Sequence, residues 1–78
     1  MPEVRIYSTH TCTFCRMAKK FFDDNSVKYA EYYVDDDEKK AAEMFGKSGQ
    51  MGVPVIDIGG KIIVGYDRRA IREALHME

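Results

Sequence analysis

The chain has 78 residues, a formal net charge of −1 and 45% hydrophobic residues. We therefore expect residues 1–78 to form a single small domain with a modest apolar core. The near-neutral charge, without a basic run, argues against nucleic acid as a partner. No apolar stretch approaches the roughly 20 residues of a membrane helix, so no membrane segment is expected. Because no signal-peptide pattern is visible, we expect a cytoplasmic protein.

The first half of the chain predicts a strand, a helix and a second strand. Residues 3–8 are typical of a short strand that is covered on both faces. Apolar residues at helical spacing predict a helix from Phe14 to about Asn25 that packs this stripe on the core. Residues 27–34 are rich in tyrosine and valine, so they predict a second strand parallel to the first. The apolar stripe consists of Phe14, Met17, Ala18, Phe21 and Phe22.

The second half predicts a helix, a hairpin and a last helix. Carboxylates favour helix N-termini, so residues 35–38 are expected to cap a helix that ends near Lys47, with a metal or acidic interaction patch as the alternative. Strands at 53–58 and 61–64 are joined by a glycine turn, and Asp67 then caps the final helix. The order βαβαββα predicts an α/β fold with a four-stranded mixed sheet flanked by three helices.

The two cysteines lie between the first strand and the first helix, in Thr11-Cys12-Thr13-Phe14-Cys15. A disulfide across so small a loop adds little stability, so the pair is predicted to be reactive. Free N–H groups and the helix dipole favour a thiolate at the first turn of a helix. We therefore predict that Cys12 attacks a disulfide and that Cys15 resolves the mixed disulfide. His10 is interpreted as a solvated histidine. The alternative is that it acts as a base, or as a charge that favours the Cys12 thiolate.

Metal binding is the competing interpretation of the cysteine pair. Two soft thiolates suit Cu(I) or a subunit-bridging iron–sulfur cluster, so a metal carrier is the second function class. The run from His10 to Cys15 also resembles the metal loop of small copper chaperones. Those domains follow the order βαββαβ and end on a strand, whereas this chain is predicted to end on a helix. We therefore expect no metal and no cofactor.

Three motifs follow one another along the chain: Cys12-Thr13-Phe14-Cys15, Gly52-Val53-Pro54 and Gly65-Tyr66-Asp67. With this order and spacing the chain resembles a glutaredoxin of the thioredoxin fold. The run from Lys47 to Ile56 is most similar to small glutaredoxin-like proteins of bacteria and archaea (the YruB type), and reductase-donor redoxins of the NrdH type are near relatives.

The resemblance implies a thiol–disulfide oxidoreductase that acts on disulfide-containing proteins. It also implies that Pro54 is a cis proline packed against the disulfide, that Val53 pairs with an extended substrate, and that residues 65–67 form the edge of the thiol groove. The implied substrate-binding residues are Thr11, Thr13, Phe14, Val53, Pro54, Gly65, Tyr66 and Asp67.

The electron donor is predicted from two positions at which this sequence differs from glutathione-using glutaredoxins. Glutathione-using glutaredoxins resemble Lys-x-x-Cys-Pro-Tyr-Cys, whereas this chain has Thr9 at the lysine position and Thr13-Phe14 between the cysteines. The charge partner for the glycine carboxylate of glutathione is therefore missing. We expect a flavin-dependent, thioredoxin-reductase-like enzyme as the donor, with glutathione secondary. The protein is expected to be a monomer.

Arg68 and Arg69 are interpreted as solvated arginines, with recognition of acidic groups as the alternative. The methionines are interpreted mainly as core residues.

Overall fold

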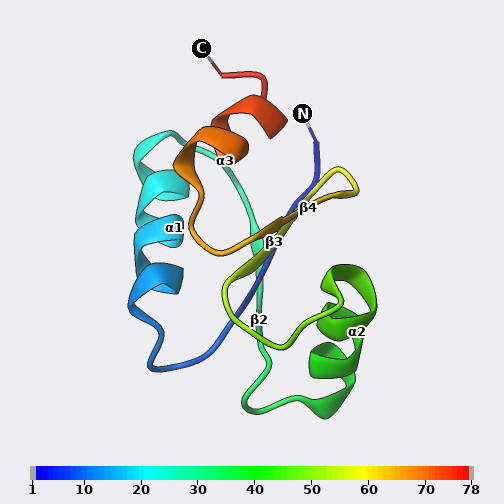
Figure 1. Cartoon of the computed structure of the whole chain (residues 1–78). Coiled ribbons are helices and arrows are strands. Elements are labelled where there is room, and N and C mark those ends of the chain that lie inside the picture. Colours follow the sequence, from blue (N-terminus) through cyan, green and yellow to red (C-terminus); the bar gives the residue numbers. More distant parts are fainter. Residues whose placement is uncertain (1, 78) are drawn as a thin grey trace.

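The computed structural model describes residues 2–77, which form a four-stranded mixed sheet with helices on both faces (Figure 1). The strand order is β2-β1-β3-β4, with β1 and β2 parallel and the other neighbours antiparallel. This confirms the predicted order βαβαββα. The elements are β1 (Val4–Ser8), α1 (Thr13–Asp24), β2 (Ala30–Tyr33), α2 (Glu38–Ser48), β3 (Val55–Ile58), β4 (Lys61–Val64) and α3 (Arg68–Ala74).

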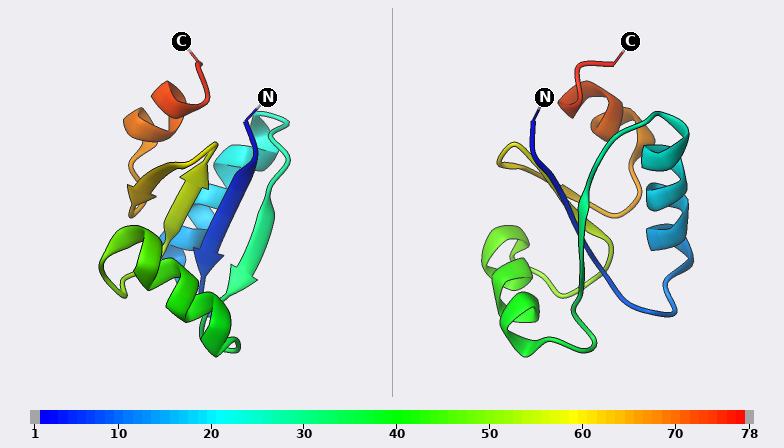
Figure 2. Two further views of the ribbon diagram at one scale, coloured as in Figure 1. Left: turned by 90° about the vertical axis from the view of Figure 1, so that its right-hand side faces the viewer. Right: turned by 180° about the vertical axis from the view of Figure 1, so that it is seen from behind.

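The helices divide between the two faces of the sheet, with α1 and α3 on one face and α2 on the other (Figure 2). Because side chains alternate along a strand, Ile6 of β1 joins the core under α1 while its neighbour Tyr7 joins the core under α2. Both are fully buried, which confirms that the first strand is covered on both sides. None of the helices within residues 2–77 is long and apolar enough to cross a membrane.

Two strands begin two or three residues later than predicted, and hydrogen bonding explains both differences. The N–H of Val27 donates to the carbonyl of Phe22 at 2.8 Å, so Val27 closes the end of α1 and β2 begins only at Ala30. Pro54 follows a cis peptide bond and has no N–H for a strand ladder, so β3 begins at Val55. The expected strand starts at residues 27 and 53 are therefore wrong.

Helix α1 buries a different face from the predicted stripe. Its buried residues are Cys15, Ala18, Phe21 and Phe22. Phe14 and Met17 precede Cys15 and Ala18 by one residue, a rotation of about 100° that turns them outward. They are 59% and 44% exposed, so their assignment to the core is wrong.

The methionines are likewise divided between core and surface. Met44 is fully buried under the sheet, as predicted, but Met17 and Met51 are exposed. Met1 lies outside the described residues. An apolar residue type therefore did not by itself identify a core position in this chain.

Helix α2 begins at a capping aspartate and ends at a glycine. The carboxylate of Asp37 accepts hydrogen bonds from the N–H groups of Lys39 and Lys40 at 3.0 and 3.1 Å, which confirms capping by this acidic run. Gly49 has φ of 73°, the left-handed conformation that commonly ends a helix. Asp35 and Asp36 of the same run contact His10 instead.

A polar network attaches α2 to the sheet. Asp57 of β3 is 7% exposed, and its carboxylate lies 2.7 Å from Nζ of Lys47 and accepts the N–H of Gly60 at 2.8 Å. Lys47 also donates to the hydroxyl of Tyr7 at 3.0 Å, and that hydroxyl donates to Glu43. Each buried charge in the network therefore has a partner, as burial requires.

Candidate active site

The three motifs meet at one end of the sheet (Figure 1). Strand β1 leads into the cysteine loop, and its residue Tyr7 pairs with Val55 of antiparallel β3. Pro54 directly precedes Val55, so it lies at the edge where β1 ends. The N–H of Gly65 donates to the carbonyl of Pro54 at 2.7 Å, which ties the exit of β4 to the same edge. Segments far apart in sequence thus converge near Cys12.

The cysteines are joined as a disulfide at the start of α1, with their Cα atoms 5.2 Å apart. Cys12 is the N-cap of the helix, in extended conformation, and its Sγ lies 3.1 Å from the N–H of Cys15. Once the disulfide is reduced, this N–H points at the sulfur and stabilises a thiolate there. Helix α1 has no acidic residue in its first turn to oppose that charge.

Accessibility distinguishes the two sulfur-bearing residues. Cys12 is half-buried, whereas Cys15 is 1% exposed and faces the core. The more exposed residue of the pair is thus the one predicted to attack first. This arrangement supports the predicted order of attack.

The predicted substrate-binding residues near the cysteine pair differ in exposure. Residues 11, 13 and 14 are exposed beside it, while Val53 is half-buried and Pro54 is buried. The Val53–Pro54 peptide bond is cis, as the family resemblance implied. The binding roles, and the packing of Pro54 on the disulfide, remain predictions.

The third motif has a confirmed structural role. The carboxylate of Asp67 accepts the N–H of Ala70 at 3.1 Å and caps α3, as the sequence predicted. Gly65 and Tyr66 are half-buried, and Gly65 adopts φ of 83°. This glycine allows the chain to leave β4 in a conformation that other residues disfavour. Its role at the edge of a groove remains a prediction.

His10 is exposed but makes contacts that the sequence analysis missed. Its Nδ1 lies 3.0 Å from Asp35, its Nε2 lies 3.6 Å from Asp36, and its ring stacks on Tyr33 with centroids 3.9 Å apart. The predicted exposure of His10 is therefore confirmed, but its ion pairs and its stacking on Tyr33 were not predicted. A signal existed, because parallel pairing of Ser8 with Tyr33 brings the residues that follow each strand together.

A hydrogen bond to Asp35 raises the pKa of His10 above its ordinary value. We expect Asp35→Asn to lower this pKa toward about 6.5, and Asp36→Asn to lower it less, because Asp36 acts only through charge. A raised folded-state pKa means that the pair stabilises the fold below about pH 6.5 and loses this effect as the pH rises through the folded value. An NMR titration of the imidazole measures both variants. Equal shifts in the two variants would contradict the assignment of Asp35 as the main partner.

A second polar cluster lies between β1, β2 and α1. Glu31 lies 2.6 Å from Nζ of Lys19, and it accepts the hydroxyl of the fully buried Ser8 at 2.9 Å. Burial alone would raise the pKa of Glu31, but the hydrogen bonds from Lys19 and Ser8 outweigh it and lower the pKa. Glu31 is therefore ionised and paired with both Lys19 and Ser8. These contacts anchor the end of β1, from which the cysteine loop starts.

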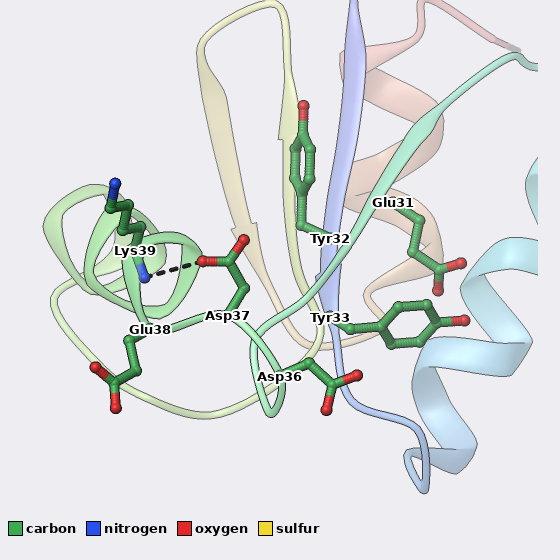
Figure 3. A pocket seen from close by; sticks show the side chains of 7 residues that line it. All are labelled: Glu31, Tyr32, Tyr33, Asp36, Asp37, Glu38 and Lys39. Carbon is green, nitrogen blue, oxygen red and sulfur yellow. Dashed lines mark hydrogen bonds between the residues drawn. The ribbon is translucent and has the colours of Figure 1, made fainter.

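A hollow of about 680 Å³ lies away from the cysteines, between β2 and the start of α2. Its side chains diverge: Glu31 and Tyr33 point toward α1, and Tyr32 points to the opposite side (Figure 3). Asp37, at its rim, is already used to cap α2. The hollow therefore lacks convergent groups for chemistry. Nearby, ligand atoms of His10, Asp35 and Asp36 lie within 4.8 Å of one another, but their ion pairs account for this arrangement.

Comparison with known proteins identifies the family. The sequence profile of the glutaredoxin family matches residues 4–63, a segment that contains both cysteines and Pro54. The chain belongs to the glutaredoxin family. The match ends before Gly65, so it does not extend to the third motif.

Individual relatives of this glutaredoxin-family chain agree with that result. It is 41% identical over 68 residues to an uncharacterized glutaredoxin-like 8.6 kDa protein of the rubredoxin operon of Clostridium pasteurianum, covering 87% of this chain and 91% of the relative. It is 36% identical to glutaredoxin 3 of Escherichia coli K12 over 67 residues, covering 86% and 81%. The crystal structure of a glutaredoxin from Archaeoglobus fulgidus superposes with a TM-score of 0.87 at 26% identity, covering 96% and 87%. The architecture is therefore that of the thioredoxin-fold glutaredoxins.

Proposed function

We propose that this protein reduces disulfides of other proteins by dithiol exchange through Cys12 and Cys15. The Cys12 thiolate attacks one sulfur of the substrate disulfide, which forms a mixed disulfide and releases the other sulfur as a thiolate that takes up a proton. Cys15 loses its proton and attacks Sγ of Cys12, which releases the second substrate thiol. Two electrons and two protons thus pass to the substrate, and the protein is left with the Cys12–Cys15 disulfide seen here.

The observation that carries this proposal is the position of Cys12 at the N-cap of α1. Its sulfur accepts the N–H of Cys15, and Cys12 is the more exposed residue of the two. A sulfur that is stabilised as a thiolate and open to solvent suits nucleophilic attack. A buried neighbour three residues later suits the resolving step.

Val53 is proposed to hold the substrate backbone. Within residues 2–77 its N–H and C=O make no backbone hydrogen bond, although the residue is half-buried at the edge of the sheet. An extended substrate segment can pair with these groups as an added strand. Pro54, which has no N–H, keeps that pairing short.

We further propose that a thioredoxin-reductase-like flavoenzyme, rather than glutathione, returns the protein to the dithiol form. Thr9 is half-buried and uncharged where glutathione-using relatives are expected to have a lysine. The glycine carboxylate of glutathione then has no ion-pair partner at this position. The proposal places the protein in the reducing cytoplasm as a monomeric, single-domain redoxin.

A coupled assay tests the choice of electron donor. The oxidised protein is given NADPH with either a thioredoxin reductase or glutathione plus its reductase, and NADPH loss is followed. We expect the first arm to be faster. Thr9→Lys should speed the glutathione arm about two- to fivefold, the effect of one exposed ion pair, and should leave the other arm unchanged.

The outcomes separate two levels of the proposal. A faster glutathione arm in the unmodified protein would refute the donor assignment but leave dithiol exchange intact. Failure of the chain to accelerate insulin reduction by dithiothreitol would refute the proposed function itself.

A further inference from the structure

A groove of about 240 Å³ runs between α1 and the start of α3. In Figure 1 the segment from β4 to α3 passes beside α1 on the face opposite α2. This α1–α3 groove is lined by Met17, Lys20, Phe21, Asp24, Tyr66 and Arg68.

The groove is continuous with the proposed active site. Met17 lies one turn after Phe14, one of the two residues between the cysteines, and both side chains are exposed on adjoining parts of α1. Tyr66, which belongs to the third motif, forms part of the opposite wall. An apolar surface therefore extends from the cysteines into the groove.

The far end of the groove carries an uncompensated positive charge. Lys20 is already paired with Asp24 at 3.0 Å. The guanidinium of Arg68 lies over the ring of Phe21, 5.8 Å from its centroid, and no carboxylate within residues 2–77 lies within 4.0 Å of it. An exposed arginine held against an aromatic ring presents its donors to a carboxylate of a partner.

We propose that the α1–α3 groove binds the segment of a substrate protein next to its reactive cysteine, and that this segment carries an apolar side chain followed by a carboxylate. The inference rests on the proposed function, because it assigns the substrate of the same site. Met17 contacts the apolar side chain and Arg68 pairs with the carboxylate. Both are specificity-determining residues that do not touch the reacting sulfurs.

Helix geometry sets the spacing of these groups. Phe21, under Arg68, is nine residues after Cys12, a rise of about 14 Å along α1. An extended chain covers this distance in about four residues, and reaches Met17 in about two. A protein segment of about four residues next to the reactive cysteine therefore spans the groove.

The test uses synthetic peptides in which one cysteine forms a mixed disulfide with thionitrobenzoate. The peptides carry leucine two residues and glutamate four residues from the cysteine, on its N-terminal side in one peptide and its C-terminal side in the other. A matched pair has glutamine in place of glutamate. Reduced full-length protein is mixed with each peptide, and release of the coloured thiol gives the rate constant. Ellman's reagent, which is too small to reach the groove, reports reactivity of the thiols alone.

We expect Arg68→Gln to slow one of the two glutamate peptides about three- to tenfold, the effect of losing a charge-assisted contact, and to leave the glutamine peptides and Ellman's reagent unchanged. Met17→Ser should slow all peptides of that orientation but not Ellman's reagent. The controls are Lys39→Gln and Phe45→Ser, matched exposed positions on α2 at the opposite face. They should change no rate.

The result distinguishes the inference from the proposed function. If the unmodified protein reacts with Ellman's reagent and with peptides but Arg68→Gln affects neither glutamate peptide, the groove assignment is overturned and dithiol exchange stands. If the unmodified protein reacts with no disulfide, the proposed function fails. Equal slowing by the α2 controls would also overturn the groove assignment.

Discussion

Replacing Cys12 by serine should reduce insulin-disulfide reduction to the background rate of dithiothreitol alone. The hydroxyl of serine is not ionised at neutral pH and forms no disulfide, so no mixed intermediate arises. Turbidity of the precipitating insulin chain measures the rate. Full turnover by this variant would refute the assignment of Cys12 as the nucleophile.

Cys15→Ser is the matched variant, because it keeps the nucleophile and removes only the resolving thiol. It should form a mixed disulfide with substrate that persists on a non-reducing gel and is detected by mass spectrometry. The N–H that faces Sγ of Cys12 belongs to the backbone of residue 15, so serine there retains it. If Cys15→Ser trapped nothing while Cys12→Ser did, the roles of the two cysteines would be reversed.

Replacing Lys47 by methionine should destabilise the fold by about 2–3 kcal/mol, because it leaves the carboxylate of Asp57 buried without its ion-pair partner. Methionine retains the apolar stem of the side chain, so the loss reports on the charge. For a domain of this size the melting temperature should fall by about 10–20 °C. Urea denaturation gives the free energy of unfolding.

Lys20→Met is the control, since it removes the lysine of an exposed pair with Asp24 by the same substitution. It should cost less than about 0.5 kcal/mol. Because Tyr7 and Glu43 also contact Lys47, a second control replaces Asp57 as well: Lys47→Met combined with Asp57→Leu should cost less than the two single changes added together. An additive result would show that the two residues do not act as a pair.

The pH dependence gives an independent check on the same pair. Burial by itself would raise the pKa of Asp57, but hydrogen bonds from Lys47 and Gly60 lower it. A lowered folded-state pKa stabilises the fold above the unfolded value of about 3.9, and this stabilisation is lost as the pH falls through the folded value. Without Lys47, burial dominates and the pKa of Asp57 rises. The stability difference between the two proteins should therefore be larger at pH 7 than at pH 3.

The cysteine site was predictable to the extent that it depends on local sequence. Two cysteines separated by two residues, between a strand pattern and a helix pattern, predict a reactive pair and the helix end at which it lies. The structure confirms Cys12 at the N-terminal end of α1, Asp67 as the cap of α3 and the tight turn at residues 59–60. Each is decided within a few neighbouring residues, where turn and capping preferences act.

Burial was predicted less well than element order. The stripe that included Phe14 and Met17 fits a helix face, but α1 is rotated so that these residues face outward. The rotation is set by Phe21 and Phe22, which reach the sheet and are buried together. A helical pattern of apolar residues predicts that one side of the helix is buried. Packing against another element decides which residues lie at the middle of that buried side.

The sequence by itself determined the order of elements, the reactive pair and the family, because periodicity, caps and motif spacing are properties of short segments. Only the tertiary structure decided that His10 pairs with Asp35, that Lys47 pairs with Asp57, and that Met17 and Arg68 line one groove. Each of these contacts joins residues from different segments of the chain. They arise from the register of the strands and the placement of helices on the sheet, which depend on the packing of the whole chain.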